Sequence, residues 1–409
     1  MKILYLHPRA WSGEYTLLKT LQARGHEVSV LEEKRHLEAG NRLISNYFLE
    51  PDDSLPTFWY DPGKGLEKAL TWPFDRFFKR SFNGRNLAHR MWIVYQACAH
   101  FKPDVIVSSE GFAYGIPASF LKRLGLLPPP LMVSFIGGDI LDCPEADVGK
   151  RRTPVTSWLI RQGLISPEIL RPVSPLLEKI LVAEGADARK VHVCPSHLPA
   201  SAELLQNTLL QKAAIRARIR QRYQIPADAP LIITLSGNQK GKGLHLLAEV
   251  WPKIQRTVPG CHWLLCGHSD PWLEQQVLPV IERQNLMHTV TRAGSLAGID
   301  VFEHLAAADI NINPSLCESL NMVTVEAAAV GTPTITSDGA GIAAWIQTYG
   351  CGQVVPATDK DALANAVIAF FKNNPPAIHQ AEKCAALAQQ FSLDRIADKL
   401  LALITATAK

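Results

Sequence analysis

Short apolar runs alternate with helical segments along this chain, and the whole alternation occurs twice. In the first half a helical pattern runs from Glu14 to Arg24, and Gly25 ends it at the position where glycine commonly follows a helix. Strands alternating with helices at this spacing form parallel sheets with crossover helices. The expected strands of the first half are residues 2–6, 26–31, 104–108, 131–136 and 191–194.

The second half restarts the same alternation after a proline-punctuated stretch, and we place the linker near residues 195–200. Its expected strands are residues 231–235, 262–266, 289–291, 310–313 and 334–336. The sequence therefore predicts an α/β fold of two doubly wound, Rossmann-like domains that face each other across a cleft. We expect a first domain at 1–197, a second at 198–388, and a C-terminal helix at 389–409 that packs back on the first domain.

Composition excludes several classes of protein. The chain has 409 residues, of which 47% are apolar and 20% charged, which suits two or three globular domains and argues against disorder. No apolar stretch approaches the ~20 residues that span a bilayer, and the first residues lack a signal-peptide pattern. Eight cysteines without a CxxC pair indicate reduced thiols, so we expect a cytoplasmic protein. The net charge of +4, contributed by residues 1–195, is too small to suggest a nucleic-acid partner.

The most informative segment is 309–338, where a strand is followed by a short loop and a helix. The helix is expected to begin near Leu320 and to end before Gly331. The free amides of Ser319, Leu320 and Asn321 then open toward the carboxyl ends of the strands. Open α/β sheets bind ligands at that edge, and a helix N-terminus there suits a phosphate.

Two carboxylates flank this helix start. Glu318 lies in the loop, and Glu326 follows Ser319 by about two helical turns, so it occupies the same face. Each carboxylate can accept two hydroxyl hydrogen bonds, which would hold a ribose and a sugar on either side of a diphosphate. The alternative is a loop charge and a solvated helix residue. For Glu326 the apolar neighbours weaken that alternative, because a charge in such a helix needs a partner or a ligand.

A second loop, at residues 236–244 (SGNQKGKGL), places Lys240 and Lys242 between a strand and a helix. Ammonium groups there can neutralise a diphosphate leaving group. The loop fits neither the Walker A pattern nor GxGxxG, and a plain surface turn is an equally good interpretation of it.

The pattern E-S-L-N-x-x-x-x-E-A at residues 318–327 resembles the E-x7-E signature of the family-4 retaining glycosyltransferases, which have the GT-B fold. The resemblance extends over the flanking blocks 306–315 and 331–338. It also includes GHEV at 25–28 and FSLDRI at 391–396, so it covers nearly the whole chain.

This resemblance implies an activity and roles for named residues. The activity is retaining, metal-independent, front-face transfer of a hexose from a nucleoside-diphosphate sugar to an acceptor hydroxyl, with no cofactor besides that donor. Glu318 and Lys242 would be the catalytic residues, binding the sugar hydroxyls and the phosphate. Glu326 would bind the ribose, and the amides of 319–321 the diphosphate. The base-contacting loop would contain Gly294 and Ser295 (RAGSL).

The sequence departs from the family pattern at four places. Asn238 replaces an arginine beside the lysine, and Lys240 is a candidate substitute. The glycine pair of the first loop is reduced to Ser12–Gly13, although Gly13 keeps its place as a diphosphate contact. The family's His-Gly-x-Asp begins with isoleucine here, at 136–139, and its late Asn-Gly is Ser-His at 196–197. These changes leave the donor and the acceptor open.

Other candidates have simpler structural interpretations. His7 ends the first strand and could face an acceptor, although a structural histidine is the more common case. Asp139 follows two glycines and could orient an acceptor hydroxyl or cap a turn. The Asp-Lys-Asp run at Asp359–Asp361 is typical of a helix N-cap, and we expect no metal.

Residues 72–100 interleave aromatic and basic side chains. One interpretation is a peripheral contact with the inner membrane face or with an anionic acceptor. Amphipathic helices packed on the sheet are the more common explanation.

Two other functions stay open at this point. A sugar-nucleotide epimerase could use the same architecture, and so could a non-catalytic nucleotide-sugar-binding protein. The acceptor could be a polysaccharide or other glycoconjugate, a lipid-linked sugar or a small molecule.

Overall fold

The computed structural model describes residues 1–6, 12–33, 55–60, 87–151, 153–237, 240–373 and 377–407. The chain divides into two compact units, each an α/β domain with a six-stranded sheet. The first domain consists of Met1–Pro144, Val148–Pro199 and Leu393–Lys409. The second consists of Glu145–Asp147 and Ala200–Ser392.

The sheet of the first domain is parallel throughout and has the strand order β3-β2-β1-β4-β5-β8. Its strands are β1 (Lys2–Leu6), β2 (Glu27–Glu33), β3 (Thr57–Tyr60), β4 (Val105–Ser108), β5 (Leu131–Phe135) and β8 (Ile169–Pro172). Its helices are α1 (Ser12–Ala23), α4 (Leu87–Phe101), the π-helix η2 (Gly111–Gly115), α5 (Ile116–Arg123), α6 (Pro154–Gly163), α7 (Pro175–Ala183) and α17 (Leu393–Thr407). A two-stranded ribbon joins β6 (Asp142–Cys143) and β7 (Val148–Gly149).

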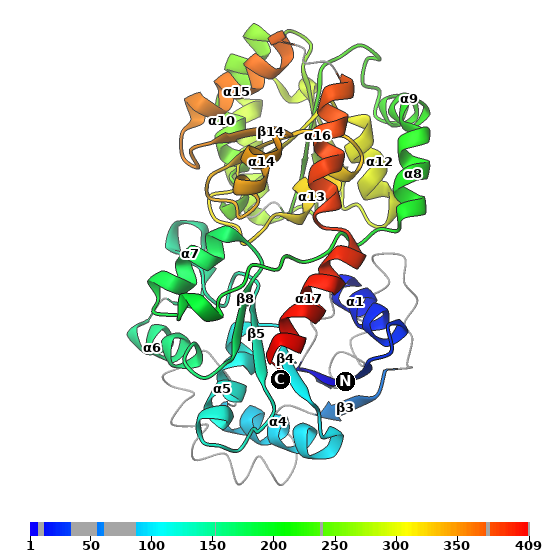
Figure 1. The fold of residues 1–409 in the computed structure, drawn as a ribbon. Coiled ribbons are helices and arrows are strands. Elements are labelled where there is room, and N and C mark those ends of the chain that lie inside the picture. Colours follow the sequence, from blue (N-terminus) through cyan, green and yellow to red (C-terminus); the bar gives the residue numbers. More distant parts are fainter. Residues whose placement is uncertain are drawn as a thin grey trace. The chain divides into compact units, whose positions relative to one another are not determined.

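The last helix of the chain belongs to the first domain. Buried Leu400 and Ile404 of α17 join the apolar cluster formed by one face of β1 and by α1 (Figure 1). Arg24 fixes the pairing at the surface, with its guanidinium 2.8 Å from Asp394 Oδ1 and 2.5 Å from Asp398 Oδ1. The expected packing of the C-terminal helix on the first domain is therefore present in the structure.

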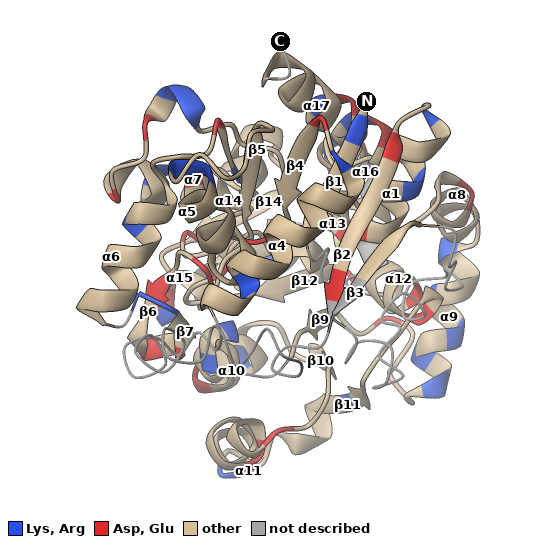
Figure 2. Cartoon of the chain, turned by 90° about the horizontal axis from the view of Figure 1, so that it is seen from below, with Lys and Arg blue, Asp and Glu red and all other residues tan. Residues whose placement is uncertain are grey.

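Three further helices of this domain, α4, α5 and α6, pack side by side. Leu4 and Leu6 of β1 are fully buried on the side facing away from Ile3 and Tyr5, so both faces of the sheet are covered. The sequences of the three helices contain lysine and arginine but no aspartate or glutamate (Figure 2).

The sheet of the second domain is also parallel, with the order β11-β10-β9-β12-β13-β14. Its strands are β9 (Leu231–Leu235), β10 (His262–Cys266), β11 (Val290–Gly294), β12 (Ile310–Asn313), β13 (Thr334–Ser337) and β14 (Gly352–Val355). Its helices are α8 (Ala202–Leu210), α9 (Lys212–Arg222), the 3-10 turn η5 (Lys240–Lys242), α10 (Leu244–Thr257), α11 (Leu278–Glu282), α12 (Ile299–Ala307), α13 (Met322–Ala329), α14 (Ala343–Tyr349), α15 (Lys360–Asn373) and α16 (Ala377–Gln389). The strand order reverses between β9 and β12, the switch point at which such sheets bind ligands.

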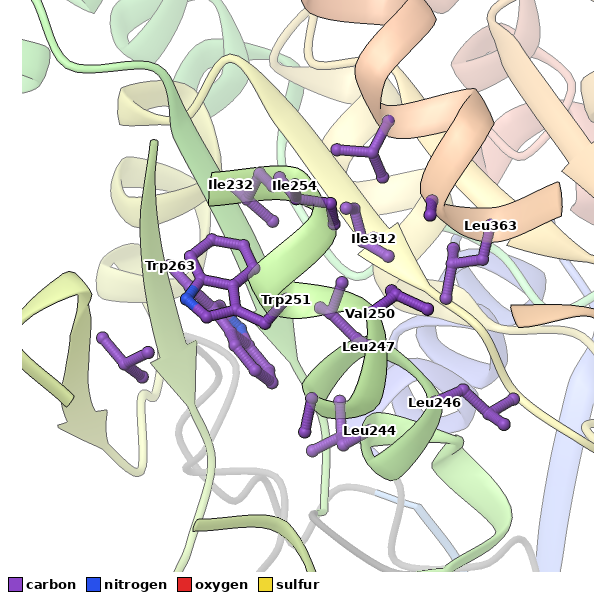
Figure 3. Packing of buried hydrophobic residues seen from close by; sticks show 14 of the residues in the cluster. Ile232, Leu244, Leu246, Leu247, Val250, Trp251, Ile254, Trp263, Ile312 and Leu363 are labelled. Atoms are coloured by element: carbon purple, nitrogen blue, oxygen red, sulfur yellow. The ribbon is translucent and has the colours of Figure 1, made fainter. Parts of the chain in front are cut away.

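Two tryptophans lie in the core of the second domain, between α10 and the sheet (Figure 3). The rings of Trp251 and Trp263 are 5.5 Å apart, and both side chains are fully buried. Each indole N–H is satisfied, by Thr289 Oγ1 at 2.9 Å and by Thr234 Oγ1 at 2.8 Å. Because a buried donor without a partner is costly, these threonines let the large rings stabilise the domain.

The expected fold class, two parallel-sheet α/β domains, is confirmed. The strand expected at 191–194 is wrong: Val191 makes a single bridge to Leu170, because the chain runs beside β8 only briefly before Pro195. The edge strands β3, β8 and β14 have weak sequence signals and were not predicted. No helix within the described residues is long and apolar enough to cross a membrane.

Candidate functional site

Two loops of the second domain meet at the switch point, because β9 and β12 are adjacent and parallel. The loop after β9 leads through η5 into α10, and the loop after β12 leads into α13. The amide of Leu316 donates to the carbonyl of Gly241 at 2.8 Å and joins the two loops directly. The residues expected to act together are thus held on neighbouring backbone segments.

Lys242 and Glu318 form an ion pair across these loops. Lys242 Nζ lies 2.5 Å from Glu318 Oε1, and the side chains are 25% and 18% exposed. Both side chains are therefore mostly buried, but each keeps some contact with solvent. The structure therefore brings together the cation and the carboxylate that the sequence predicted for one site.

Close backbone approach fixes the loop that carries Glu318. The Glu318 amide donates to Gly339 O, and the Glu318 carbonyl accepts from the Gly341 amide, each at 2.9 Å. A Cβ on Gly339 would stand 2.3 Å from Leu316 O, and a Cβ on Gly243, whose φ is +70°, would stand 2.0 Å from Pro314 O. Only glycine fits at these two positions, so the loop geometry depends on them.

A chain of side-chain hydrogen bonds continues from Glu318 to the start of α13. The Ser315 hydroxyl lies 2.9 Å from Glu318 Oε2 and 2.6 Å from Asn313 Oδ1. Asn313 Nδ2 donates to Asn321 Oδ1 at 3.0 Å, and that oxygen caps the helix by accepting from the Thr324 amide. A ligand that hydrogen-bonds to Glu318 would therefore affect this whole network and not one isolated side chain.

The N-terminus of α13 leaves backbone donors available. Asn321, the N-cap, has φ +81°, a conformation that asparagine tolerates better than most residues. The amides of Ser319, Leu320 and Asn321 have no hydrogen-bond partner within the described residues. Unpaired amides at a helix start carry partial positive charge and suit an anion.

Glu326 lies in α13 and is 3% exposed. Burial raises the pKa of its carboxyl group from 4.5 to about 7. Its oxygens make no hydrogen bond or ion pair with any residue that the structure describes. A carboxyl group held in this way is a candidate ligand-binding group, because nothing in the described protein compensates its charge.

Sequence reasoning missed the lysine that holds the far end of α13. Lys212 Nζ donates to the carbonyls of Val330 at 2.8 Å and Gly331 at 3.1 Å. These are carbonyls that a helix end leaves without partners, and a cation there also matches the helix dipole. Burial lowers the pKa of Lys212. The polar helix α9 offered no sequence signal that this lysine would reach another helix.

Comparison with known proteins gives matches along most of the chain. The family model for glycosyl transferases group 1 matches residues 229–373, and the model for the glycosyl transferase 4-like domain matches residues 15–197. The chain belongs to the family-4 glycosyltransferases, which have the GT-B fold.

Individual relatives agree with this family. A putative colanic acid biosynthesis glycosyltransferase, WcaL of Salmonella typhimurium, is 25% identical over 85% of this chain and 84% of its own length. A GDP-mannose-dependent phosphatidylinositol monomannoside mannosyltransferase of Mycobacterium tuberculosis is 30% identical over 38% of this chain and 41% of its own. The crystal structure of Anabaena Alr3699/HepE in complex with UDP superposes with a TM-score of 0.74 at 16% identity, covering 99% of this chain and 100% of that one.

The remaining predicted contacts of the glycosyltransferase lie in loops of the second domain, in the first domain, or outside the described residues. Gly294 ends β11 with φ +75°, and Ser295 follows it; both are exposed. Lys240 is exposed in η5. Gly13 lies in the first turn of α1. Asn238 and His7 fall outside the described residues.

Asp139 is bound by its own domain. Its carboxylate, 3% exposed, accepts from the amides of Gly111 at 2.7 Å, Gly137 at 2.8 Å and Ile136 at 3.2 Å. Burial, with the nearby Glu110 carboxylate, raises its pKa, while the three hydrogen bonds act in the opposite direction. This geometry favours the turn-capping alternative over a role toward an acceptor.

The Asp359–Asp361 run forms a helix start, as predicted. Asp359 Oδ1 accepts from the Ala362 amide at 2.9 Å, and Asp361 pairs with Lys253. Across the described part of the chain, no group of three or more His, Cys, Asp or Glu side chains is arranged to hold a metal ion.

Proposed function

We propose that this glycosyltransferase transfers a hexose from a nucleoside-diphosphate sugar to an acceptor hydroxyl with retention of the anomeric configuration. One observation carries the proposal: Lys242, from the loop after β9, pairs with Glu318, which lies on the loop that leads to the free amides at the start of α13. The cation and the amides match the charge of a diphosphate, and the carboxylate matches the hydroxyls of a sugar.

Binding of the donor would rearrange the Lys242–Glu318 ion pair. A diphosphate oxygen would take over Lys242 Nζ, and Glu318 would be released to accept sugar hydroxyls while Ser315 keeps it oriented. The unpartnered carboxyl of Glu326 would accept the ribose hydroxyls. Lys240, exposed in the same loop, would add a second cation, and Gly294 and Ser295 would contact the base.

The chemistry then needs no group beyond these. The bond between the anomeric carbon and the diphosphate oxygen breaks, and the acceptor oxygen bonds to that carbon on the same face. The acceptor's proton passes to the departing phosphate. Lys242 and the amides of 319–321 stabilise the charge that develops on the diphosphate, and they do so without a metal in this proposal.

The names of the relatives support a role in polysaccharide biosynthesis. WcaL is described as a colanic acid biosynthesis enzyme, and the neighbour HepE was crystallised with UDP. We extend to this chain a role in polysaccharide or glycoconjugate biosynthesis in the cytoplasm. The base and the sugar would be identified by a thermal-shift screen of UDP-, GDP-, ADP- and TDP-sugars, since a ligand at 100 times its Kd adds ~2.7 kcal/mol.

The decisive experiment replaces Lys242 with alanine. We expect kcat/KM for transfer to fall by at least ~10²-fold, comparable to the loss of one oxyanion donor. Lys253→Ala, which removes a surface lysine paired with Asp361 in the same domain, is the matched control and should leave the rate near wild type. An unchanged rate in Lys242→Ala would refute the assignment, and NMR of the anomeric proton in the product tests retention separately.

A further inference from the structure

Exposed apolar side chains gather on one part of the first domain. Eleven large apolar residues are exposed within the described part of the chain, and seven of them lie on α4, α5, α6 or the loops that follow them. They are Trp92, Tyr95, Leu124, Leu126, Val155, Trp158 and Ile165. Scattered exposed apolar residues are ordinary, but a gathering of this kind marks an interaction surface.

Part of this gathering is one continuous stripe. Trp92, Tyr95 and Ala99 follow one another at helical spacing on the exposed side of α4, while Ile93 and Val94 pack into the core. The rings of Trp92 and Tyr95 are 6.2 Å apart. One side of α4 thus packs on the core of the domain, whereas Trp92 and Tyr95 on the other side are 41% and 39% exposed.

The stripe ends in a groove of about 480 Å³ between α4 and the segment that leads into β5. Its walls include Tyr95, Ala99, Lys102, Leu126, Pro128 and Pro129. The helices of a parallel α/β unit end near the start of the next strand, so the groove opens at the amino edge of the sheet. The walls are apolar, and Lys102 places a cation among them.

The carboxylates near this surface already have partners. Glu168 pairs with Lys122 and Glu184 with Arg161, each at 3.0 Å, and Asp104 accepts from the backbone amide of Lys2 at 2.7 Å. Arg123 donates to the neutral amide of Gln162 at 2.8 Å and, like Lys102, has no ion pair within the described residues. Gln162 is four residues after Trp158, so Arg123 lies beside that tryptophan's face of α6.

We propose that the amino-edge surface, defined as Trp92, Tyr95, Lys102, Arg123, Leu126 and Trp158, docks the first domain on a lipid bilayer with anionic headgroups. Tryptophan and tyrosine have an apolar body and a polar tip, which suits the lipid–water boundary, and unpaired cations complement acidic headgroups. A second copy of the chain is a poorer occupant. A symmetric contact would bring the same unpaired cations of both copies close together.

Vesicle sedimentation tests this directly and requires neither donor nor acceptor, so its outcome is independent of the proposed transfer reaction. The full-length protein should bind vesicles of phosphatidylcholine with phosphatidylglycerol, and binding to phosphatidylcholine alone should be weaker. Added salt should weaken binding to the vesicles that contain phosphatidylglycerol and not binding to phosphatidylcholine alone, since salt screens exposed charges.

Two variants remove the two components of the surface. Lys102→Glu with Arg123→Glu should lower partitioning to the acidic vesicles by roughly 30-fold or more, at about a factor of five per charge removed. Trp92→Ser with Tyr95→Ser should lower partitioning to both vesicle types by at least ~10-fold. Matched controls lie in the second domain: Lys372→Glu with Arg283→Glu for exposed charge, and Leu209→Ser with Leu210→Ser for exposed apolar area.

Several results would overturn the proposal. They are absence of vesicle binding by the wild-type protein, equal binding to neutral and acidic vesicles, and control variants that lose as much as the surface variants. A concentration-dependent dimer that Trp92→Ser with Tyr95→Ser abolishes would assign the surface to a second copy instead. The charge variant changes only exposed side chains, so the test stands even if the aromatic variant fails to fold.

Discussion

Asp139 and Glu326 are buried carboxyl groups, one in each domain, and they differ in what surrounds them. Asp139 accepts three backbone amides, whereas Glu326 has no partner within the described residues. Burial raises the pKa of both groups, and only for Asp139 do hydrogen bonds from its own domain counteract it. Burial alone therefore does not mark a ligand-binding carboxylate. A buried carboxylate that accepts hydrogen bonds from its own domain stabilises the fold, whereas one without such hydrogen bonds is a candidate to bind a ligand.

The largest expected effect follows from removing Asp139. Asp139→Ala leaves the buried amides of Gly111 and Gly137 and the half-buried amide of Ile136 without an acceptor. Each buried donor left in this way costs ~1–3 kcal/mol, so we expect the first domain to lose roughly 4 kcal/mol of stability. Calorimetric melting would measure this loss. Asp139→Asn keeps one acceptor oxygen and should fall between alanine and wild type. A melting temperature unchanged in Asp139→Ala would contradict the capping role.

The pH dependence of Glu326 should be the next largest effect. Its pKa is raised from 4.5 to about 7 by burial, so the folded protein holds a proton that the unfolded chain has released. The free energy of unfolding should therefore decrease as the pH rises between these two values, by up to roughly 3 kcal/mol. Urea unfolding of wild type and Glu326→Gln measures the difference. The variant should match wild type at acidic pH and be the more stable above neutrality, and parallel profiles would show that the carboxyl group is compensated.

A smaller effect is expected on ligand affinity. Glu326→Gln keeps the shape of the side chain and loses the charge, so nucleotide binding by the second domain should weaken about tenfold, the worth of one hydrogen bond to a charged group. In wild type the affinity should rise as the pH passes 7, and the variant should lose that rise. Titration calorimetry with nucleoside diphosphates provides both numbers. Asp139→Asn is the control whose nucleotide affinity should stay that of wild type.

Local rules were sufficient for the fold class and for the segment at 309–338. The turn at Gly331, the apolar helix and the position after a central strand all follow from residue types and spacing, so the loop and helix start could be placed beforehand. The ion pair between Lys242 and Glu318 could only be suspected, because it joins loops that are distant in sequence.

Other features could not be predicted from the sequence because they depend on long-range packing. Asp139 in a Gly-Gly-Asp loop looks the same whether it caps a turn or faces a ligand, and the choice depends on the amide of Gly111 from a different strand connection. The grip of Lys212 on the end of α13 and the short edge strands were missed for the same reason. The exposure of Trp92 and Tyr95 likewise depends on which side of α4 meets the sheet.

The packing of α17 on the first domain has a consequence for how the protein folds while it is being translated. The apolar cluster that begins with β1 at residue 2 is completed by side chains near residue 404. During translation the first domain must therefore wait, with Leu17 and Leu21 of α1 lacking their final neighbours, until the ribosome has produced the entire second domain. Until then the nascent chain would expose the apolar side chains of α1 to chaperones. A chain truncated before α17 would lack part of the core of the first domain.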